Sequence, residues 1–241
     1  MSGPVPIKQG GSAIVIMPQG ETMIVEIWSD IACPWCYIGR RRFENALASF
    51  EHRDQVKVIW RSFELDPNAP GDYAGSVNDL LADRYGMTRE RAERVNQHVT
   101  ELAAVEGLEY HLDRAHPVNS LDAHRLIHLA AQHNLQSEMK ERLQKAYFTE
   151  GAVVSDVETL VRLAVEVGLN ADETQQMLTG DSYHDAVRAD QHRAQQIGIH
   201  GVPFFLLDGK YAVSGAQPTE IFTTALQRAW ADAILENSSE N

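Results

Sequence analysis

A Cys-x-x-Cys motif, placed where a strand pattern gives way to a helix pattern, constrains the fold of this chain more than any other feature. The apolar run MIVEIW, residues 23–28, predicts a short buried strand. The tetrapeptide Cys33-Pro34-Trp35-Cys36 comes next and is followed by apolar residues at helical spacing. Proline suits the first turn of a helix, where its missing N–H is not needed. The sequence therefore predicts that a helix begins inside the motif.

The rest of the chain shows strand and helix patterns in a clear order. The first helix is expected to reach about residue 50, and a β-branched and aromatic run predicts a second strand at 56–63. Two apolar runs around an Asp-Gly turn predict a hairpin at 202–214, and a last helix is expected over 218–235. The helices predicted between the second strand and the hairpin are 76–85, 88–106, 119–133, 136–149, 156–168, 171–179 and 182–197.

This order predicts an α/β core into which an all-helical domain is inserted. The core is expected to consist of residues 23–66 and 199–238, and the insertion of residues 67–198. Helix 182–197 adjoins the second core segment, so it is a candidate to pack on the core. Residues 1–22 are rich in Gly, Pro and Ser and predict a flexible extension.

Charge and hydropathy limit the functions that the chain can have. Its 241 residues carry a formal net charge of −13, which argues against binding to nucleic acid or to an anionic membrane surface. No stretch approaches the roughly 20 apolar residues of a membrane span. The first 22 residues contain one basic residue, Lys8, and lack the pattern of a secretory signal. A cytoplasmic location is expected, where thiols are kept reduced.

Cys33 and Cys36 are the only cysteines in the sequence, and their placement predicts redox chemistry. The free N–H groups and the dipole of a helix N-terminus favour a thiolate at Cys33, so its pKa is expected to lie below the free-thiol value of about 8.5. Cys36 follows one turn later, within bonding reach. Cys33 is therefore predicted to be the exposed nucleophile and Cys36 the buried resolving thiol of a dithiol–disulfide exchange.

Two alternatives to redox chemistry are weaker. A structural zinc site takes about four Cys or His ligands, but there is no second Cys-x-x-Cys and the nearest histidine is His52, so zinc would have to be shared across a dimer. No metal is therefore expected. A purely structural disulfide across so short a loop gains little from closure entropy and is rare in the cytosol.

Four further side chains are candidates for the site. Asp30 precedes the motif and Glu64 follows the second strand, so either is a possible relay for the proton of Cys36, or a solvated carboxylate at a strand end. Trp35 is a candidate apolar docking surface or a core residue. Gln217, in the SGAQ stretch, is a candidate to line a substrate cleft.

Several stretches together resemble a known family. CPWC after a first strand, a long helical insertion, and Gly-Val-Pro ahead of a hairpin resemble the DsbA-like thioredoxin-fold oxidoreductases. The segments that resemble the FrnE-like branch of that family are EIWSDIACPWCYIGRRRFE, FELDP, AHRLIHLA and GIHGVPFFLLDGKYAVSGAQP. The resemblance covers about residues 23–235 and implies a thioredoxin-like fold.

The resemblance also implies roles for individual residues. Cys33 would attack a disulfide and Cys36 would resolve the mixed disulfide. Pro203 would be a cis-proline facing the cysteines, and the backbone of Val202 would pair with an extended substrate. The substrate-binding residues would be Pro34, Trp35, Val202 and Gln217. The periplasmic DsbA enzymes carry His in the third place of the motif, where this chain has Trp35, and this difference argues against a strong oxidant.

We therefore expect an enzyme, a thiol–disulfide oxidoreductase that reduces or rearranges protein disulfides. Its substrates would be disulfide-containing proteins or small thiols, and it would need no cofactor beyond the Cys33–Cys36 disulfide, with glutathione as a possible reductant. One alternative is a glutathione-dependent transferase or isomerase of the kappa-class or hydroxychromene-carboxylate type, which does not need a second thiol, so Cys36 argues against it. Another is a redox sensor or binding module without catalysis.

Overall fold

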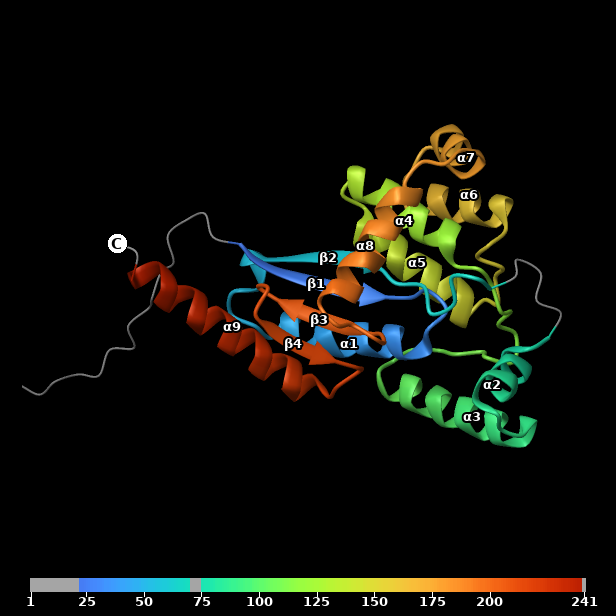
Figure 1. Ribbon diagram of the computed structural model, residues 1–241, viewed down its shortest axis with the longest axis horizontal. Helices are drawn as coiled ribbons and strands as arrows, with labels where there is room; N and C mark the ends of the chain where they lie inside the picture. The colour runs from blue at the N-terminus through green and yellow to red at the C-terminus, as the bar shows by residue number, and fades with distance from the viewer. Residues whose placement is uncertain (1–21, 70–74, 240–241) are drawn as a thin grey trace, which may run out of the picture.

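A mixed four-stranded sheet forms the centre of the protein in a computed structural model that describes residues 22–69 and 75–239 (Figure 1). The strand order is β2-β1-β3-β4. β1 pairs in parallel with β2 and antiparallel with β3, and β3 pairs antiparallel with β4. The bounds are β1 Met23–Ser29, β2 Val56–Ser62, β3 Phe204–Leu207 and β4 Tyr211–Ser214.

Helices lie between β1 and β2, between β2 and β3, and after β4. They lie close to their predicted positions, although the last one continues past residue 235 and the third strand begins at Phe204, after the proline that cannot donate to a ladder. The bounds are α1 Pro34–Ala48, α2 Val77–Tyr85, α3 Arg89–Val105, α4 Leu121–Gln132, α5 Gln136–Phe148, α6 Val157–Glu166, α7 Ala171–Thr179, α8 His184–Gln196 and α9 Thr219–Ser239.

One face of the sheet packs against α1 and α9. Alternate residues of the central strands, among them Ile27 and Phe205, are fully buried there. The ring of Phe205 lies 5.5 Å from that of Phe43 on α1 and 4.6 Å from that of Phe222 on α9. Aromatic pairs of this kind contribute roughly 0.5–1.5 kcal/mol each beyond the area that they bury. This packing fixes α1, and with it the motif, against the sheet.

The opposite face is covered by α8. Trp28 is fully buried there with Ala194 and Ile199, and its Nε1 donates to the backbone O of Asp190 at 3.0 Å. Helix 182–197 of the sequence analysis thus packs on the sheet (Figure 1). The boundaries predicted for the two domains stay a prediction, and the predicted extension lies, up to residue 21, outside the described residues.

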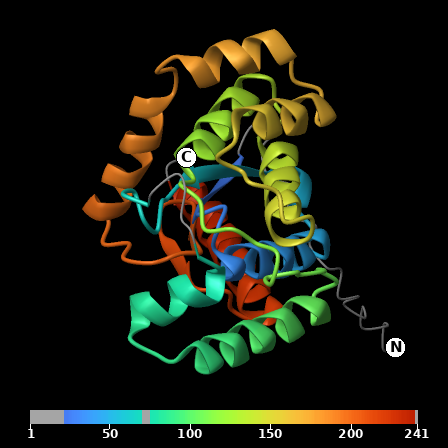
Figure 2. The same ribbon diagram turned by 90° about the vertical axis from the view of Figure 1, so that its right-hand side faces the viewer.

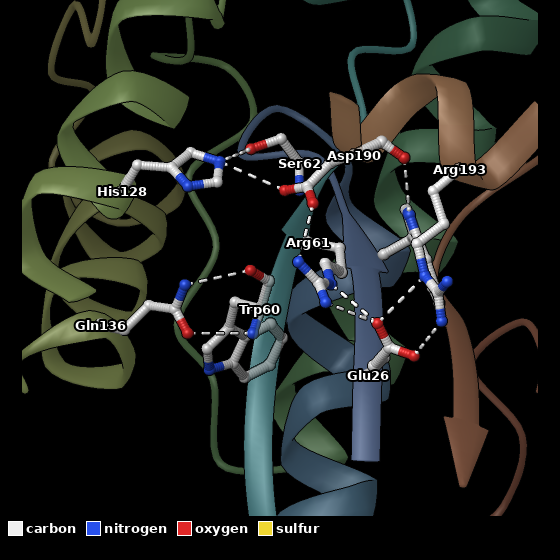
Figure 3. Close-up of polar contacts among 9 residues, drawn as sticks. Glu26, Trp60, Arg61, Ser62, His128, Gln136, Asp190 and Arg193 are labelled. Carbon is white, nitrogen blue, oxygen red and sulfur yellow. Dashed lines mark hydrogen bonds and ion pairs between the residues drawn. The ribbon is translucent and has the colours of Figure 1, made fainter. Parts of the chain in front are cut away.

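A cluster of charged side chains joins α8 to the first two strands. The carboxylate of Asp190 accepts hydrogen bonds from the backbone N–H of Ser62 at 2.9 Å and from Arg61 at 3.1 Å (Figure 3). Glu26 of β1 accepts from Arg61 at 2.9 Å and from Arg193 of α8 at 2.7 Å. Burial opposes the ionisation of Glu26, but the two guanidinium groups outweigh it and lower its pKa. The two carboxylates and the two guanidinium groups of the cluster therefore neutralise one another at the contact between α8 and the sheet.

The inserted helices lie on two sides of the sheet end at which β1 finishes. Figures 1 and 2 show α2 and α3 on one side and α4 to α7 on the other. Buried apolar contacts run without interruption from the sheet into these helices. Among the described residues, no helix is both long and apolar enough to cross a membrane.

Candidate active site

The Cys-x-x-Cys motif lies at the end of β1, and α1 begins inside it as predicted. Cys33 is the N-cap residue, with φ −91° and ψ 112°, and Pro34 opens the helix. The backbone N–H of Cys36 donates to the carbonyl O of Cys33 at 3.0 Å. The two sulfurs are present as free thiols. The motif is thus held as the first turn of a helix, with the nucleophile candidate at its end.

Both thiols are buried, so the prediction of an exposed Cys33 is wrong. Cys33 is 4% exposed and Cys36 1%. The Sγ of Cys33 lies 3.8 Å from the carbonyl O of Val202, on the segment that leads into β3. On another side, the hydroxyl of Tyr110 donates to the carbonyl O of Pro34 at 2.8 Å and brings the chain after α3 over the motif. Segments distant in sequence, which no local pattern reveals, therefore cover the sulfur.

The prediction of a low pKa at Cys33 is also wrong. Its hydrogen bond to the sulfur of Cys36 raises the pKa most, followed by burial and by the negative charges of Cys36 and Asp30. A hydrogen bond from the backbone N–H of Cys36 acts in the opposite direction and is outweighed. The helix N-terminus is thus present, but its effect is smaller than that of the buried surroundings.

This environment predicts an unusual pH profile of thiol modification. Alkylation of Cys33 by iodoacetamide should still be accelerating at pH values above the ordinary thiol pKa of about 8.5, because the thiolate forms late. The Cys36→Ser variant removes the sulfur–sulfur hydrogen bond that raises the pKa of Cys33 most, so the pH profile of alkylation should move to lower pH. Rates would be measured by mass spectrometry with fragmentation to locate the label. A plateau below neutral pH in the native chain would contradict the prediction.

Pro203 lies against α1, and a glycine makes the close approach possible. The Val202–Pro203 peptide bond is cis, as the resemblance implied. A Cβ added at Gly39 would lie 2.9 Å from the Cγ of Pro203 and 3.3 Å from the Cα of Ala216. Gly39 belongs to no motif of the sequence, although a glycine inside a helix pattern usually has a packing reason.

Replacing Gly39 by alanine should therefore push α1 away from Pro203. The ring of Pro203 and the backbone of Ala216 cannot yield as a flexible side chain would. We expect a loss of roughly 1–3 kcal/mol in the free energy of unfolding, as for other overpacked sites, although alanine is the better helix former. Urea unfolding would measure it, with Ala48→Gly at the end of the same helix as a control for helix propensity. Unchanged stability would show that the gap between α1 and Pro203 is not tight.

Asp30 lies beside the motif in a fully buried position, so its interpretation as a solvated carboxylate is wrong. Its Oδ2 accepts from the backbone N–H of Leu65 at 2.7 Å, and its Oδ1 lies 3.4 Å from Nε2 of His124. Burial opposes ionisation, but the hydrogen bonds from His124 and Leu65 outweigh it and hold the pKa of Asp30 below its ordinary value. Burial also lowers the pKa of His124, so a charged carboxylate faces a neutral imidazole at neutral pH.

Glu64 is buried as well, but its hydrogen bonds lead away from the motif. Its Oε2 accepts from Arg188 at 2.5 Å and from Gln191 at 3.0 Å, both on α8. Its Oε1 is buried and has no hydrogen-bond partner among the residues that the structure describes. Of the two relay candidates, Asp30 is thus the one whose charge acts on the motif, because it is among the groups that raise the pKa of Cys33.

The predicted substrate-binding residues differ in their surroundings. Trp35 is 39% exposed and so is available as a docking surface. Pro34 and Val202 are half-buried at the motif and beside Cys33. Gln217 is exposed, and its amide donates to the carbonyl O of Ser214 at 2.9 Å. The role of each in binding stays a prediction.

Two buried side chains of the insertion approach the motif and were missed at the sequence level. One is His124, described above. The other is Lys140 of α5, whose Nζ donates to the carbonyl O of Ser29 at 3.1 Å. The sequence does indicate that Lys140 is buried, because it lies three residues before Leu143 and seven before Tyr147, on the apolar stripe of its helix.

Ser62, His128 and Asp190 have the residue types of a hydrolase triad but not its geometry. The Nε2 of His128 lies 3.1 Å from the hydroxyl of Ser62 and 3.2 Å from the carboxylate of Asp190 (Figure 3). A triad needs the serine and the carboxylate on different ring nitrogens. Among the described residues, no group of three or more His, Cys, Asp or Glu side chains is arranged to hold a metal ion.

Comparison with known proteins agrees with this geometry. A family model described as DSBA-like thioredoxin domain matches residues 24–227. A probable DsbA oxidoreductase of Streptomyces coelicolor is 47% identical, with a TM-score of 0.83 over 87% of this chain and 90% of that one. YwbO, an uncharacterized protein of Bacillus subtilis, is 29% identical over 208 residues, or 85% of this chain and 96% of that protein.

A more distant structure shares the fold. The cytosolic disulfide reductase DsbM of Pseudomonas aeruginosa, which has also been solved with GSH, is 18% identical, with a TM-score of 0.61 over 86% of this chain and 98% of that one. A thioredoxin-like fold with a helical insertion and a dithiol at the start of a helix defines the class of thiol–disulfide oxidoreductases. The chain belongs to the DSBA-like thioredoxin domain family.

Proposed function

We propose that this protein reduces or rearranges disulfide bonds of other proteins through Cys33 and Cys36. The observation that carries the proposal is the placement of two adjacent thiols in the first turn of α1, with the Sγ of Cys33 3.8 Å from the carbonyl of Val202. A strand-like substrate that pairs with the backbone of Val202 would bring its disulfide to Cys33.

The chemistry requires two exchanges. The Cys33 thiolate attacks one sulfur of the substrate disulfide, forms a mixed disulfide and releases the other substrate sulfur as a thiolate, which takes up a proton. Cys36 then loses its proton and attacks the Sγ of Cys33, which closes the Cys33–Cys36 disulfide and releases the second substrate thiol. Two electrons and two protons pass from the enzyme to the substrate. An external thiol, for which we propose glutathione, restores the dithiol.

The direction of reduction is supported by the motif and by a relative of the same fold. Trp35 carries no charge that would stabilise a thiolate, and the buried Cys33 has a raised pKa, whereas strong oxidants stabilise their reduced form as a thiolate. DsbM, which shares the fold, is described as a cytosolic disulfide reductase. We therefore propose a cytosolic location and a protein held mainly as the dithiol.

The test is a pair of measurements on the native chain. Insulin reduction, followed as turbidity with glutathione and glutathione reductase as the electron source, should be faster with the protein than without it. Equilibration in glutathione buffers should give a reduction potential of roughly −150 to −250 mV. A potential more positive than about −140 mV would reverse the proposed direction. Full turnover of a small electrophile with glutathione by the Cys36→Ser variant would instead support the transferase-like alternative.

A further inference from the structure

A polar cavity of about 270 Å³ lies between α2, α3 and the chain that follows α3. The described residues that line it include Asn78 of α2, Asn96 and Thr100 of α3, and Tyr110 and Asp113 after α3. Its volume is below the roughly 300–1,000 Å³ of a pocket that encloses a drug-sized ligand. The cavity therefore has room for one side chain or a similarly small group.

Tyr110 places this cavity beside the Cys-x-x-Cys motif. It lines the cavity, and its hydroxyl donates to the carbonyl O of Pro34 at 2.8 Å. Its ring stacks on that of Phe148, with 4.7 Å between the ring centres, so the tyrosine is held firmly in this position. One tyrosine side chain and one peptide unit thus separate the cavity from Cys33. An extended polypeptide covers such a span in about two to four residues, at about 3.3 Å per residue.

The charges that line the cavity are negative. Glu93 and Asp113 line it, and the described residues around it include no lysine, arginine or histidine. Asp113 has no ion-pair partner among the residues that the structure describes. Glu93 lies 3.3 Å from Arg89, but both side chains of that pair are more than half exposed, so the pair contributes little. The cavity therefore favours a cation.

A buried amide with an open oxygen also points to a ligand. Asn96 is 8% exposed, and its Nδ2 donates to the Oδ1 of Asn78 at 2.6 Å. Its own Oδ1 accepts no hydrogen bond from a described residue, and it is not fully enclosed by protein atoms. This oxygen is thus available to a donor inside the cavity. A guanidinium group has five N–H donors in one plane and no acceptor, which suits a site made of an amide oxygen and two carboxylates.

We propose that this cavity binds a guanidinium group, the side chain of an arginine that lies about two to four residues from the reacting cysteine of a substrate polypeptide. The inference rests on the proposed function and adds to it a preference for substrate sequence. The arginine anchors the polypeptide while its disulfide reaches Cys33. No bond is made or broken in the cavity, so the arginine acts on KM and not on kcat.

A metal ion and an ammonium group fit the cavity less well. Among the described residues, no group of three or more His, Cys, Asp or Glu side chains is arranged to hold a metal, and the cavity has two carboxylates. An ammonium has three donors and is more strongly hydrated than a guanidinium, so it loses more on leaving water. The arginine side chain is therefore the ligand that the lining matches best.

Binding can be measured on the native chain without turnover. Nα-acetyl-arginine amide would be titrated into the reduced protein, and the side-chain amide signals of Asn78, Asn96 and Gln97 would be followed by NMR. These signals should shift progressively with the arginine compound, whereas the uncharged citrulline analogue should leave them in place. No shift, or equal shifts with the two compounds, would overturn the assignment and leave a cavity that holds water alone.

Variants at the two carboxylates test the source of the affinity. Asp113→Asn combined with Glu93→Gln should weaken binding of the arginine compound about tenfold, because each exposed ion pair contributes up to about fivefold. Glu90→Gln is the matched control, since that side chain is exposed on the same helix and does not line the cavity. An equal loss in the control and the double variant would show that the net charge of the protein, and not this cavity, attracts the cation.

The substrate role is tested with two disulfide-bonded peptides that differ at one position, three residues from a cysteine. The peptide with arginine should be reduced with a KM about fivefold or more below that of the peptide with citrulline, and with the same kcat. This preference should disappear in the Asp113→Asn/Glu93→Gln variant. Equal KM values in the native chain would overturn the proposal for substrates. A chain that binds the arginine compound but reduces neither peptide would refute the proposed function alone.

Discussion

Replacing Cys33 by serine is expected to reduce insulin turnover to the uncatalysed rate. Disulfide exchange needs a thiolate nucleophile, and a serine hydroxyl supplies none at neutral pH. The substitution is nearly isosteric in a site where the sulfur is 4% exposed, so the fold should persist. The matched control is Ser49→Cys, at the far end of α1, combined with Cys33→Ser. A cysteine at that position should not restore activity, because it lies far along the helix from Val202 and Pro203.

Replacing Cys36 by serine should have a different and equally large effect. Cys33 still attacks, but no second thiol releases the substrate, so mixed disulfides accumulate. They would be counted by mass spectrometry without reductant after incubation with a disulfide-bonded protein. The double variant Cys33→Ser/Cys36→Ser must trap nothing. If the single variant traps no substrate, or if the mixed disulfide forms at Cys36 in Cys33→Ser, the assigned order of attack is wrong.

The order of strands and helices could be predicted because each element carries its own pattern. The start of α1 follows from a proline after a cysteine at the end of an apolar run, and the hairpin from Asp-Gly between two apolar runs. The position of α8 was only a possibility, since its sequence is strongly polar. Its contacts with β2 and β1 depend on Asp190 and Arg193, which meet Ser62 and Glu26, more than a hundred residues away in sequence.

The candidate site could be predicted only as far as its local part. The two cysteines and the helix N-terminus are contiguous, and the hydrogen bond to Cys36 that raises the pKa of Cys33 most is local, but the burial that raises it further needs segments distant in sequence. Tyr110 follows α3, His124 lies on α4 and Lys140 lies on α5. Which helix face turns toward the motif is decided by packing of the whole insertion. The helix N-terminus alone therefore predicts the wrong direction for the pKa of Cys33.

The same limit explains the triple arginine of α1. On sequence alone, the run Arg40-Arg41-Arg42 predicts a solvated helix face, with attraction of anionic thiols as the alternative. The structure contradicts the solvated face, because Arg40 is 5% exposed, bonds Glu44 at 2.7 Å and lies 5.0 Å from the Trp60 ring centre. Arg42 pairs with Glu106 at 2.6 Å. Arg42 thereby connects α1 to the insertion, and so does Arg40, which lies 3.2 Å from the carboxylate of Glu141 on α5.

Replacing Asp190 by alanine should strongly destabilise the protein at a site away from the thiols. Its carboxylate is 5% exposed, accepts from the backbone N–H of Ser62 and from Arg61, and lies 3.2 Å from Nε2 of His128. Removing it leaves a buried N–H without an acceptor and leaves Arg61 with Glu26 as its remaining carboxylate. Removing one partner of a buried charge pair typically costs 3–5 kcal/mol. We expect about 3 kcal/mol here, because Arg61 keeps one partner.

Urea unfolding at neutral pH would measure this loss, with an unchanged m-value as the sign that only stability has changed. Asp190→Asn should lose less, because its amide oxygen still accepts from Ser62. Asp185→Ala is the matched control, since that side chain is fully exposed in the first turn of the same helix and should contribute less than about 1 kcal/mol. If Asp190→Ala stays within 1 kcal/mol of the native chain, the cluster in Figure 3 is not what holds α8 to the sheet.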